Sequence, residues 1–443
     1  MKKKFPLIHQ IEDCLNQTFG NNLKNLTFDL ALSGGKDSMT LLHLLKDLSG
    51  ILGFRLRAIH VHHGLSKSAD HWLNLCKEIC AKKGIEFIFS KVQVEEKHEL
   101  GIEGRARELR YQELNRLKKG ILVMAHHQQD QVETFMLQLL RGSGLKGLSS
   151  MQVIDHKRSL FRPMLNVNPE LIDEYVRTYN IEHVNDESNE DDRFDRNYLR
   201  NNVLPNLIKR SPSTLANIAR SISLIAEGYQ LNESIALLDF KKFIDQSDLS
   251  RIRLDAFNQL PKDRFINLVR FWLSMNDLLM PSMRVMQELF DQMSLKNHLG
   301  LNAVDLSKTT KIIAYQDFLW IVNTTKGTDY EIDWHGEKEI NLPTNGRLNF
   351  IRKKGQGLDF KKLDNLKIRN RRGGEKIKLA TNEPTRTLKN LLNSNQIPPW
   401  YRDQFPVLVS DKDVVAVPIF GVNLDYQVKG SEFGYILDWQ PSI

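Results

Sequence analysis

The stretch LTFDLALSGGKDS at residues 26–38 decides the fold of the first half of the chain. Apolar side chains alternate along residues 26–32, which predicts a β-strand. The Ser-Gly-Gly sequence at residues 33–35 ends this alternation, and apolar residues then recur at helical spacing over residues 39–48. The stretch therefore predicts a strand, a tight turn and a helix in succession.

The turn at residues 33–35 has the features of a phosphate-binding site. Consecutive glycines let the backbone approach a ligand closely, and the helix that follows directs free N–H groups and the positive end of its dipole at the turn. Ser33 and Ser38 add hydroxyl donors, and Lys36 adds a positive charge. Asp37 would repel phosphate unless it holds Mg²⁺ that bridges to the phosphates. The spacing is neither that of a Walker loop nor G-x-G-x-x-G, and an ordinary glycine turn before a helix is the alternative.

Composition narrows the class of protein. A chain of 443 residues is long enough for several domains, and 41% hydrophobic with 26% charged residues is typical of globular proteins. The net charge of +8 fits a polyanionic partner but does not demonstrate one. Three cysteines do not suggest a disulfide framework, so we expect a reducing, cytoplasmic location. The N-terminus lacks signal-peptide features, and no apolar run approaches the roughly 18 residues of a membrane span.

Strands and helices alternate along the first part of the chain. Apolar runs at residues 54–61, 86–92 and 121–125 predict further strands separated by helical patterns. This order is typical of an α/β fold with a doubly wound parallel sheet and helices on both faces. Ligands bind such sheets beyond the carboxyl ends of the strands. That edge would gather the phosphate loop, His62–Gly64 and residues 126–134.

Acidic residues and histidines at this edge are the candidates for chemistry. Asp130 and Glu133 share a face at the start of a helix, where a carboxylate can hold Mg²⁺ or accept a proton. Capping of the helix N-terminus by Asp130 is the alternative. Three histidines at residues 60–63 are not completed by further ligands nearby, so nucleotide contact by His63 or simple turn packing is favoured over a metal site.

Basic residues indicate where RNA would bind. The loop at residues 141–148 suits phosphate contact, as does the arginine-rich helix at residues 101–111, for which a solvated charged face is the alternative. Near the C-terminus, Arg371 and Arg372 suit the phosphate backbone, and Trp400, expected to be exposed, suits base stacking. A charged surface on an ordinary α+β domain is the alternative there.

The S-G-G-x-D-S turn resembles the pyrophosphate loop of the N-type ATP pyrophosphatases, the PP-loop superfamily. Further motifs over the first half of the chain resemble those of tRNA(Ile)-lysidine synthases: H-V-x-H-G-L at 60–65, E-x-x-A-R-x-x-R-Y at 103–111, A-H-H-x-x-D-Q-x-E-T at 125–134, L-x-R-G-x-G at 139–144 and D-x-S-N-x-D-x-x-F-x-R-N-x-L-R at 186–200. Residues from 366 onward resemble the C-terminal domain of the longer members. The sequence departs from the family pattern at two positions. Gln129 stands where the family usually has aspartate, and Ser66 stands where a basic residue often follows Gly-Leu.

The resemblance implies a tRNA-modifying ligase that uses ATP and Mg²⁺. It would adenylate the C2 carbonyl of the wobble cytidine in a tRNA(Ile) with a CAU anticodon. The amino group of L-lysine would then replace AMP, giving lysidine and changing the codon read from AUG to AUA. A homodimer is implied as well.

The resemblance also assigns roles to residues. Asp130, Asp37, His126 and Lys36 would be catalytic, with Asp37 and Asp130 holding Mg²⁺. The ATP contacts would be Ser33, Gly34, Gly35, Lys36, Asp37, Ser38 and His63. The contacts to tRNA or substrate would be Arg107, Arg110, Glu133, Arg141, Arg196, Asn197, Arg200, Arg371, Arg372 and Trp400.

Four regions are expected. Residues 1–212 would form the catalytic domain, and the resemblance implies an adenine nucleotide alpha hydrolase-like fold for it. Residues 213–325 would form a mainly helical substrate-binding domain. Residues 326–365 would be linker and short strands, and residues 366–443 a small α+β domain that binds tRNA.

Three other functions fit parts of the pattern. A tRNA thiolase of the same fold needs reactive cysteines, whereas Cys76 and Cys80 are expected on a helix elsewhere with buried side chains. An ATP pyrophosphatase acting on a small substrate would not need the basic C-terminal region. A tRNA-binding protein with a relic nucleotide site would not need the intact loop.

Overall fold

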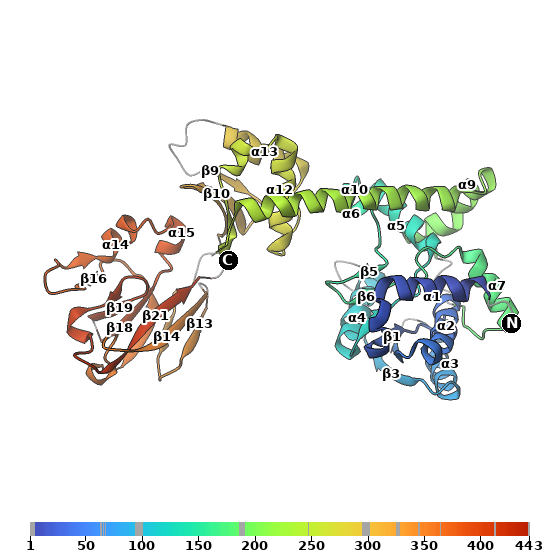
Figure 1. Ribbon diagram of the computed structural model, residues 1–443, viewed down its shortest axis with the longest axis horizontal. Coiled ribbons are helices and arrows are strands. Elements are labelled where there is room, and N and C mark those ends of the chain that lie inside the picture. The colour runs from blue at the N-terminus through green and yellow to red at the C-terminus, as the bar shows by residue number, and fades with distance from the viewer. Residues whose placement is uncertain are drawn as a thin grey trace. The chain divides into compact units, whose positions relative to one another are not determined.

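The computed structural model describes residues 5–62, 64, 66, 68–93, 101–185, 191–246, 248–294, 302–324, 328–343, 346–363, 365–411 and 413–441. The chain divides into two compact units, Met1–Leu231 (unit 1) and Asn232–Ile443 (unit 2) (Figure 1). None of the described helices is long and apolar enough to cross a membrane.

Unit 1 is built on a six-stranded sheet with the strand order β3-β2-β1-β4-β6-β5. All neighbouring pairs are parallel except β5 and β6. The strands are β1 (Thr27–Ala31), β2 (Arg55–His62), β3 (Glu86–Lys91), β4 (Ile121–Val123), β5 (Ile154–Asp155) and β6 (Leu160–Phe161). The prediction of a parallel sheet is thereby confirmed, with β1 in its interior.

Helices cover both faces of this sheet. On one face α1, α2, α3 and α7 enclose the larger apolar core, which includes Leu15 and Tyr175. On the other face Leu114 of α4 packs with Ile59 and Leu122 of the sheet. The helices are α1 (Pro6–Phe19), α2 (Lys36–Leu52), α3 (Ala69–Lys82), α4 (Gly101–Leu117), α5 (Gln128–Leu140), α6 (Leu145–Leu148), α7 (Pro169–Tyr179), α8 (Asp195–Tyr198), α9 (Leu204–Arg210) and α10 (Thr214–Phe243), which continues into unit 2.

A buried charge in β1 ties the strands together. Asp29 is fully buried, and its carboxylate lies 2.8 Å from Nη1 of Arg57 on β2. The same carboxylate accepts hydrogen bonds from the backbone N–H groups of Lys119 and Gly120, just before β4. A buried carboxylate needs such partners because burial without them costs several kcal/mol. Asp29 therefore fixes β1 between its two neighbours.

The first part of unit 2 combines helices with a five-stranded sheet of order β7-β8-β11-β10-β9. Two of its strands, β10 (Thr310–Tyr315) and β11 (Phe318–Asn323), form an antiparallel hairpin. The sequence pattern indicates mainly helix here and does not indicate the other strands, which are short and carry few apolar residues: β7 (Ile244–Asp245), β8 (Asp248–Arg253) and β9 (Asn302–Asp305). The helices are α11 (Ala256–Gln259), α12 (Lys262–Met275) and α13 (Met283–Ser294).

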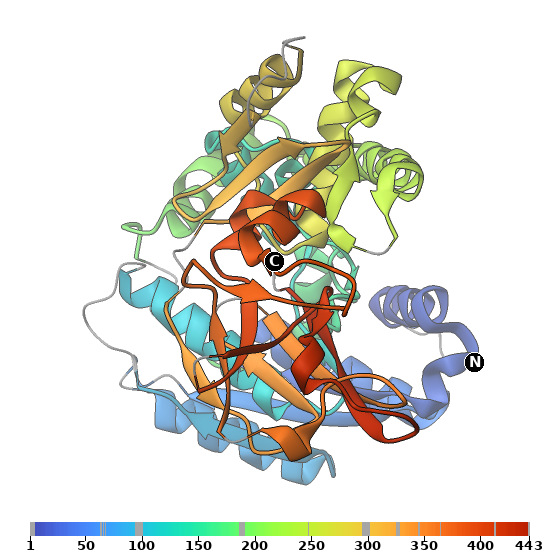
Figure 2. The same cartoon turned by 90° about the vertical axis from the view of Figure 1, so that its left-hand side faces the viewer.

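The C-terminal part of unit 2 is an α+β arrangement of antiparallel sheets. One has the order β12-β15-β18-β19-β20, another β13-β14-β21, and β16 pairs with β17. Residues 326–365, expected to be linker and short strands, include strands that join these sheets. Strand β12 pairs with β15, β13 pairs with β14, and β14 pairs with β21. The short helices lie at one end of the strands (Figures 1 and 2).

The elements of this C-terminal part are β12 (Glu331–Asp333), β13 (Glu339–Leu342), β14 (Gly346–Lys354), β15 (Leu366–Asn370), β16 (Lys376–Ile377), β17 (Arg386–Thr387), α14 (Leu388–Ser394), α15 (Pro399–Arg402), β18 (Pro406–Ser410), β19 (Asp413–Val417), β20 (Gly421–Val422) and β21 (Phe433–Gln440).

Candidate active site

The phosphate loop follows β1 and ends where α2 begins at Lys36. Gly34 has a φ of +91°, and a Cβ at this position would lie 3.2 Å from Sγ of Cys76 and 3.2 Å from a methyl group of Val184. The N–H of Val184 also donates to the carbonyl oxygen of Gly34. Both the backbone angle and the close packing explain why glycine stands there.

Two serine hydroxyls line this loop. Oγ of Ser33 lies 3.1 Å from Oγ of Ser38 and accepts from the N–H of Gly35, while Oγ of Ser38 donates to the carbonyl oxygen of Gly35. Ser33 is exposed and Ser38 is buried. Together with the N-terminus of α2, these groups form a donor-rich cradle for an anion.

Lys36 has a partner that the sequence did not indicate. Its Nζ lies 2.5 Å from Oδ1 of Asp173 on α7, and both side chains are partly exposed. The lysine is thus engaged beside the loop. An incoming phosphate would compete with Asp173 for this charge.

His127 lies between the two predicted acids. Its Nε2 is 3.7 Å from a carboxylate oxygen of Asp37 and 3.6 Å from one of Asp130. Its Nδ1 accepts from the N–H of Gln129, which fixes the ring at the start of α5. His126, and not His127, was predicted from the sequence, although the position of His127 directly before a helix is one where a capping side chain is common.

The Asp37 carboxylate fits a hard cation. Burial raises its pKa, and the nearby His127 and Lys36 oppose that rise. Its Oδ1 is buried and has no hydrogen-bond partner among the described residues. Within the same residues no group of three or more His, Cys, Asp or Glu side chains could hold a metal ion. Two carboxylates suit Mg²⁺, because this ion keeps several waters and takes further oxygen atoms from phosphates.

Asp130 belongs to a four-residue charge cluster. Its carboxylate lies 2.8 Å from Nη2 of Arg196 and 3.2 Å from Nη2 of Arg200. Glu133 is fully buried and contacts Nε of both arginines, at 2.7 and 2.6 Å. Gln129, the departure from the family pattern, donates to Glu133 at 3.2 Å. The two acids are therefore neutralised by two arginines, and Gln129 adds no charge.

Asp130 also caps α5, which was the alternative to a role in chemistry. Its carboxylate accepts from the N–H of His127 at 2.9 Å, and the two residues form a capping box. Burial disfavours the charge on Asp130, but His127 and Arg196 outweigh this effect and lower the pKa of the carboxyl to about 2. The residue therefore stays ionised at neutral pH.

His126 is held neutral beside this cluster. Burial of the ring lowers its pKa to about 3, and the charges of Arg162 and Arg196 act in the same direction. Its Nδ1 is buried without a hydrogen-bond partner among the described residues. Arg162, to which the sequence assigned no role, is a buried arginine that follows β6 and donates to the carbonyl oxygen of Gln152.

Other residues predicted to contact the substrate in unit 1 have contacts of their own, and the charge of Arg107 also acts to lower the pKa of His126. Arg107 and Arg110 on α4 lie over the ring of Tyr111, at 5.4 and 5.9 Å from its centroid. Arg141 is exposed at the end of α5. The side chain of Asn197 donates to the carbonyl oxygen of Asp191. His63 and residues 186–190 lie outside the described residues.

The predicted contacts in unit 2 have structural partners. Arg372 pairs with Glu331 at 2.9 Å, and Arg371, which is mostly buried, lies 4.0 Å from Glu375. The expectation that Trp400 is exposed is wrong. It is half-buried among aromatic rings that include Tyr315 and Trp320, each 5.5 Å away between centroids.

The cysteines do not provide a reactive pair. Cys76 and Cys80 are buried, and burial raises the pKa of each thiol to about 12. The expectation that they lie elsewhere needs correction for Cys76, because its sulfur packs beneath Gly34 of the phosphate loop. A neutral, buried thiol is a packing group and a poor nucleophile. The thiolase alternative is not favoured.

Comparison with known proteins agrees with this arrangement. Residues 7–207 match a PP-loop domain, residues 253–320 a TilS substrate binding domain, and residues 366–439 a TilS substrate C-terminal domain. The chain is similar to the tRNA(Ile)-lysidine synthase of Nitrosomonas europaea, with 31% identity covering 93% of this chain and 92% of the relative. It is 33% identical to that of Coxiella burnetii, covering 94% of each, and 41% identical to that of Histophilus somni over 62% of this chain and 64% of the relative. The chain belongs to the tRNA(Ile)-lysidine synthase family.

Proposed function

We propose that the protein ligates L-lysine to C2 of the wobble cytidine in a tRNA(Ile) with a CAU anticodon, at the expense of ATP. The observation that carries the proposal is the placement of the phosphate loop and the Asp37–His127–Asp130 group beside one another, in a chain of this family. The loop supplies anion contacts for ATP, and the acids lie where the reacting groups would meet it.

In the first step the C2 oxygen of cytidine attacks the α-phosphorus of ATP. Pyrophosphate leaves, and we assign the donors of Ser33, Gly35 and Ser38 to hold it. Asp37, whose Oδ1 has no hydrogen-bond partner among the described residues, would hold Mg²⁺, which would supply positive charge against the leaving pyrophosphate, and Asp130 would join it by exchanging its arginine partners for the ion. Lys36 would exchange Asp173 for phosphate.

In the second step the amino group of lysine attacks C2, and AMP leaves. With a pKa of about 2, Asp130 is a weak base, so its charge is better suited to attracting the lysine ammonium than to removing a proton. His126 stays neutral and would orient or polarise the cytidine. Arg196 and Arg200 neutralise the acids until substrate arrives, and a role in holding AMP or RNA phosphate would require them to change partners.

The test is the release of pyrophosphate and AMP with ATP, Mg²⁺, labelled lysine and a CAU-anticodon tRNA(Ile) transcript, each omitted in turn. We expect release to need the RNA and label to enter it. Pyrophosphate release without label in the RNA would favour another nucleophile, as in a thiolase. RNA binding without any pyrophosphate release would favour a relic nucleotide site. The homodimer that the resemblance implies stays a prediction, checked by light scattering.

A further inference from the structure

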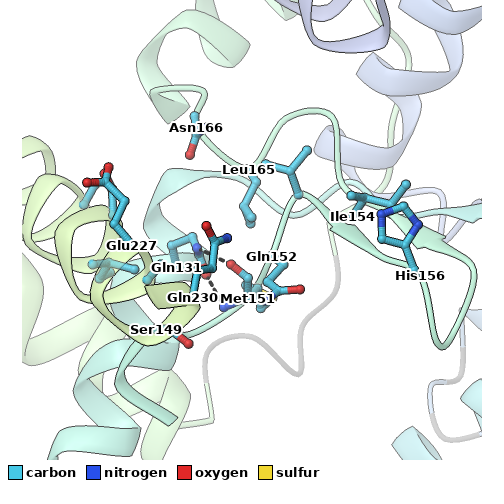
Figure 3. Close-up of a pocket in the computed structure, with 15 residues that line it drawn as sticks. Gln131, Ser149, Met151, Gln152, Ile154, His156, Leu165, Asn166, Glu227 and Gln230 are labelled. Carbon is cyan, nitrogen blue, oxygen red and sulfur yellow. Dashed lines mark hydrogen bonds between the residues drawn. The ribbon is translucent and has the colours of Figure 1, made fainter. Parts of the chain in front are cut away.

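Unit 1 contains a cavity that the proposed chemistry does not use. Its volume is about 450 Å³, and it lies between the start of α5, the segment from Ser149 to Ile154 and the first half of α10 (Figure 3). This size is in the range of sites for small organic ligands. All residues that line it belong to unit 1 and are described.

The wall nearest to the active site is preformed. Gln131 follows Asp130 directly on α5, but its side chain points to the cavity side. Its amide donates to the carbonyl oxygen of Met151 and accepts from the N–H of the same residue, both at 2.8 Å. This pair of bonds, drawn in Figure 3, locks the segment that forms the wall. Successive residues of a helix point about 100° apart, so the cavity and the acid cluster lie on different sides of one helical turn.

The lining combines an apolar floor with a polar rim. Leu165 and Ile222 are buried in the floor, whereas Gln152, Asn166 and Ser223 are exposed at the rim. These three side chains are uncharged and polar. They present amide and hydroxyl groups, which can both donate and accept.

The charges of the lining exclude several ligands. Among the lining residues Glu227 is the one acid, His156 is the one basic side chain, and neither lysine nor arginine is present. A phosphate group or the carboxylate of an amino acid would find no lysine or arginine partner among the lining residues. The cavity therefore suits an uncharged ligand with apolar faces and hydrogen-bonding edges.

A nucleobase has these properties. Unpaired bases of RNA loops are commonly inserted into such pockets, where their faces pack on apolar side chains and their edges form hydrogen bonds. Exposed basic residues lie close by in sequence on two of the segments that form the cavity, Lys146 before Ser149 and Arg220 on α10, and would suit the phosphates of the same strand.

We propose that this cavity binds a second, unmodified base of the RNA substrate, close to the cytidine that reacts on the other side of α5. The inference rests on the proposed function, since it takes an RNA loop as the ligand. It adds a position at which the sequence of the RNA is read away from the reacting base. Ser223 lines the rim of the cavity from α10, and Gln152 lines it from the segment after α6.

The experiment compares Ser223→Phe, which fills the cavity, with Ser221→Phe. Ser221 is exposed two residues earlier on α10 and does not line the cavity, so it provides the same substitution on the opposite side of the helix. The Kd for CAU-anticodon tRNA(Ile) is measured by fluorescence anisotropy at fixed salt. Each nucleotide that flanks the reacting cytidine is replaced in turn by an abasic one.

We expect one abasic position to weaken binding to the wild type by about 10-fold or more. Ser223→Phe should weaken binding to intact RNA by a similar factor and show no further loss with RNA that is abasic at that position. Ser221→Phe should behave like the wild type. Gln152→Ala, an exposed truncation that leaves the fold intact, should give a smaller loss coupled to the same position.

The proposal is overturned if Ser223→Phe binds intact RNA as tightly as Ser221→Phe does. It is also overturned if, at every abasic position, the fold-loss in affinity caused by Ser223→Phe or Gln152→Ala is the same as with intact RNA. Lysine incorporation is measured in parallel with the wild type. The Kd can be measured without turnover. If no lysine is incorporated but one abasic position still loses its effect in Ser223→Phe, the proposed reaction is rejected and the base-binding cavity is retained.

Discussion

At the scale of single residues, the site depends on positions where one backbone angle sets the shape of the loop or one charge sets what can bind. The sequence indicated Gly34, Asp37 and Asp130, because a glycine turn before a helix suits an anion and a carboxylate beside that anion needs a cation. It did not indicate Asp173, or that His127 lies beside Asp37, because each of these contacts joins residues distant in sequence that only the fold brings together.

Gly34 and Gly35 should respond differently to the same substitution. Gly34→Ala forces a side chain into a positive φ and against Cys76, so we expect a loss of about 1–3 kcal/mol in the free energy of unfolding. Gly35 has a φ of −69° and its nearest neighbour would be Oγ of Ser33 at 3.4 Å, so Gly35→Ala should leave stability unchanged. Urea denaturation of both variants checks this, and equal losses would contradict it.

The neutral state of His126 predicts a dependence of stability on pH. Its pKa is about 3 in the folded protein and about 6.5 when unfolded, so the unfolded chain binds more protons between these values. The stability that follows from a neutral ring is present above pH 6.5 and is lost as pH falls, by roughly 2 kcal/mol between pH 7 and pH 5. Chemical denaturation should show this loss in the wild type and a clearly smaller one in His126→Asn. Parallel pH profiles for the two proteins would refute it.

At the scale of elements, the pattern of the sequence predicts long or buried segments well. The strand at Thr27–Ala31 and the helix at Lys36–Leu52 have strong periodicity and a glycine turn between them. Strand β8 was not indicated, since the sequence of Asp248–Arg253 is mostly polar and buries only Ser250 and Ile252. Short strands of this kind form because neighbouring strands complete their hydrogen bonds, and that information lies elsewhere in the chain.

Two arginines of β2 should differ in their effect on stability. Arg57 is buried against Asp29, so Arg57→Met leaves a buried carboxylate without its charge partner and should cost about 3–5 kcal/mol. Arg55 on the same strand is exposed and pairs with Glu86, so Arg55→Met should cost less than about 1 kcal/mol. Thermal and urea unfolding distinguish them, and a small loss for Arg57→Met would show that Asp29 is held by the backbone N–H groups alone.

At the scale of the whole molecule, composition indicated a polyanionic partner without locating its site. With a net charge of +8, we expect the affinity for tRNA to fall steeply with salt, because bound phosphates release counterions. Kd measured between about 50 and 200 mM salt should rise by at least 10-fold. A Kd that does not change with salt would mean that phosphate contacts contribute little. The structure adds what composition could not, since Arg371, Arg372 and Trp400 have partners within unit 2.

The central claim is that the edge holding the phosphate loop, Asp37 and Asp130 transfers AMP to RNA before lysine enters. The most direct measurement uses ATP labelled at the α-phosphate, with CAU-anticodon tRNA(Ile) and no lysine. We predict label bound to the RNA, released as AMP when lysine is added, and absent with Asp37→Asn. Pyrophosphate release with no label ever bound to the RNA, or full labelling by Asp37→Asn, would contradict the account.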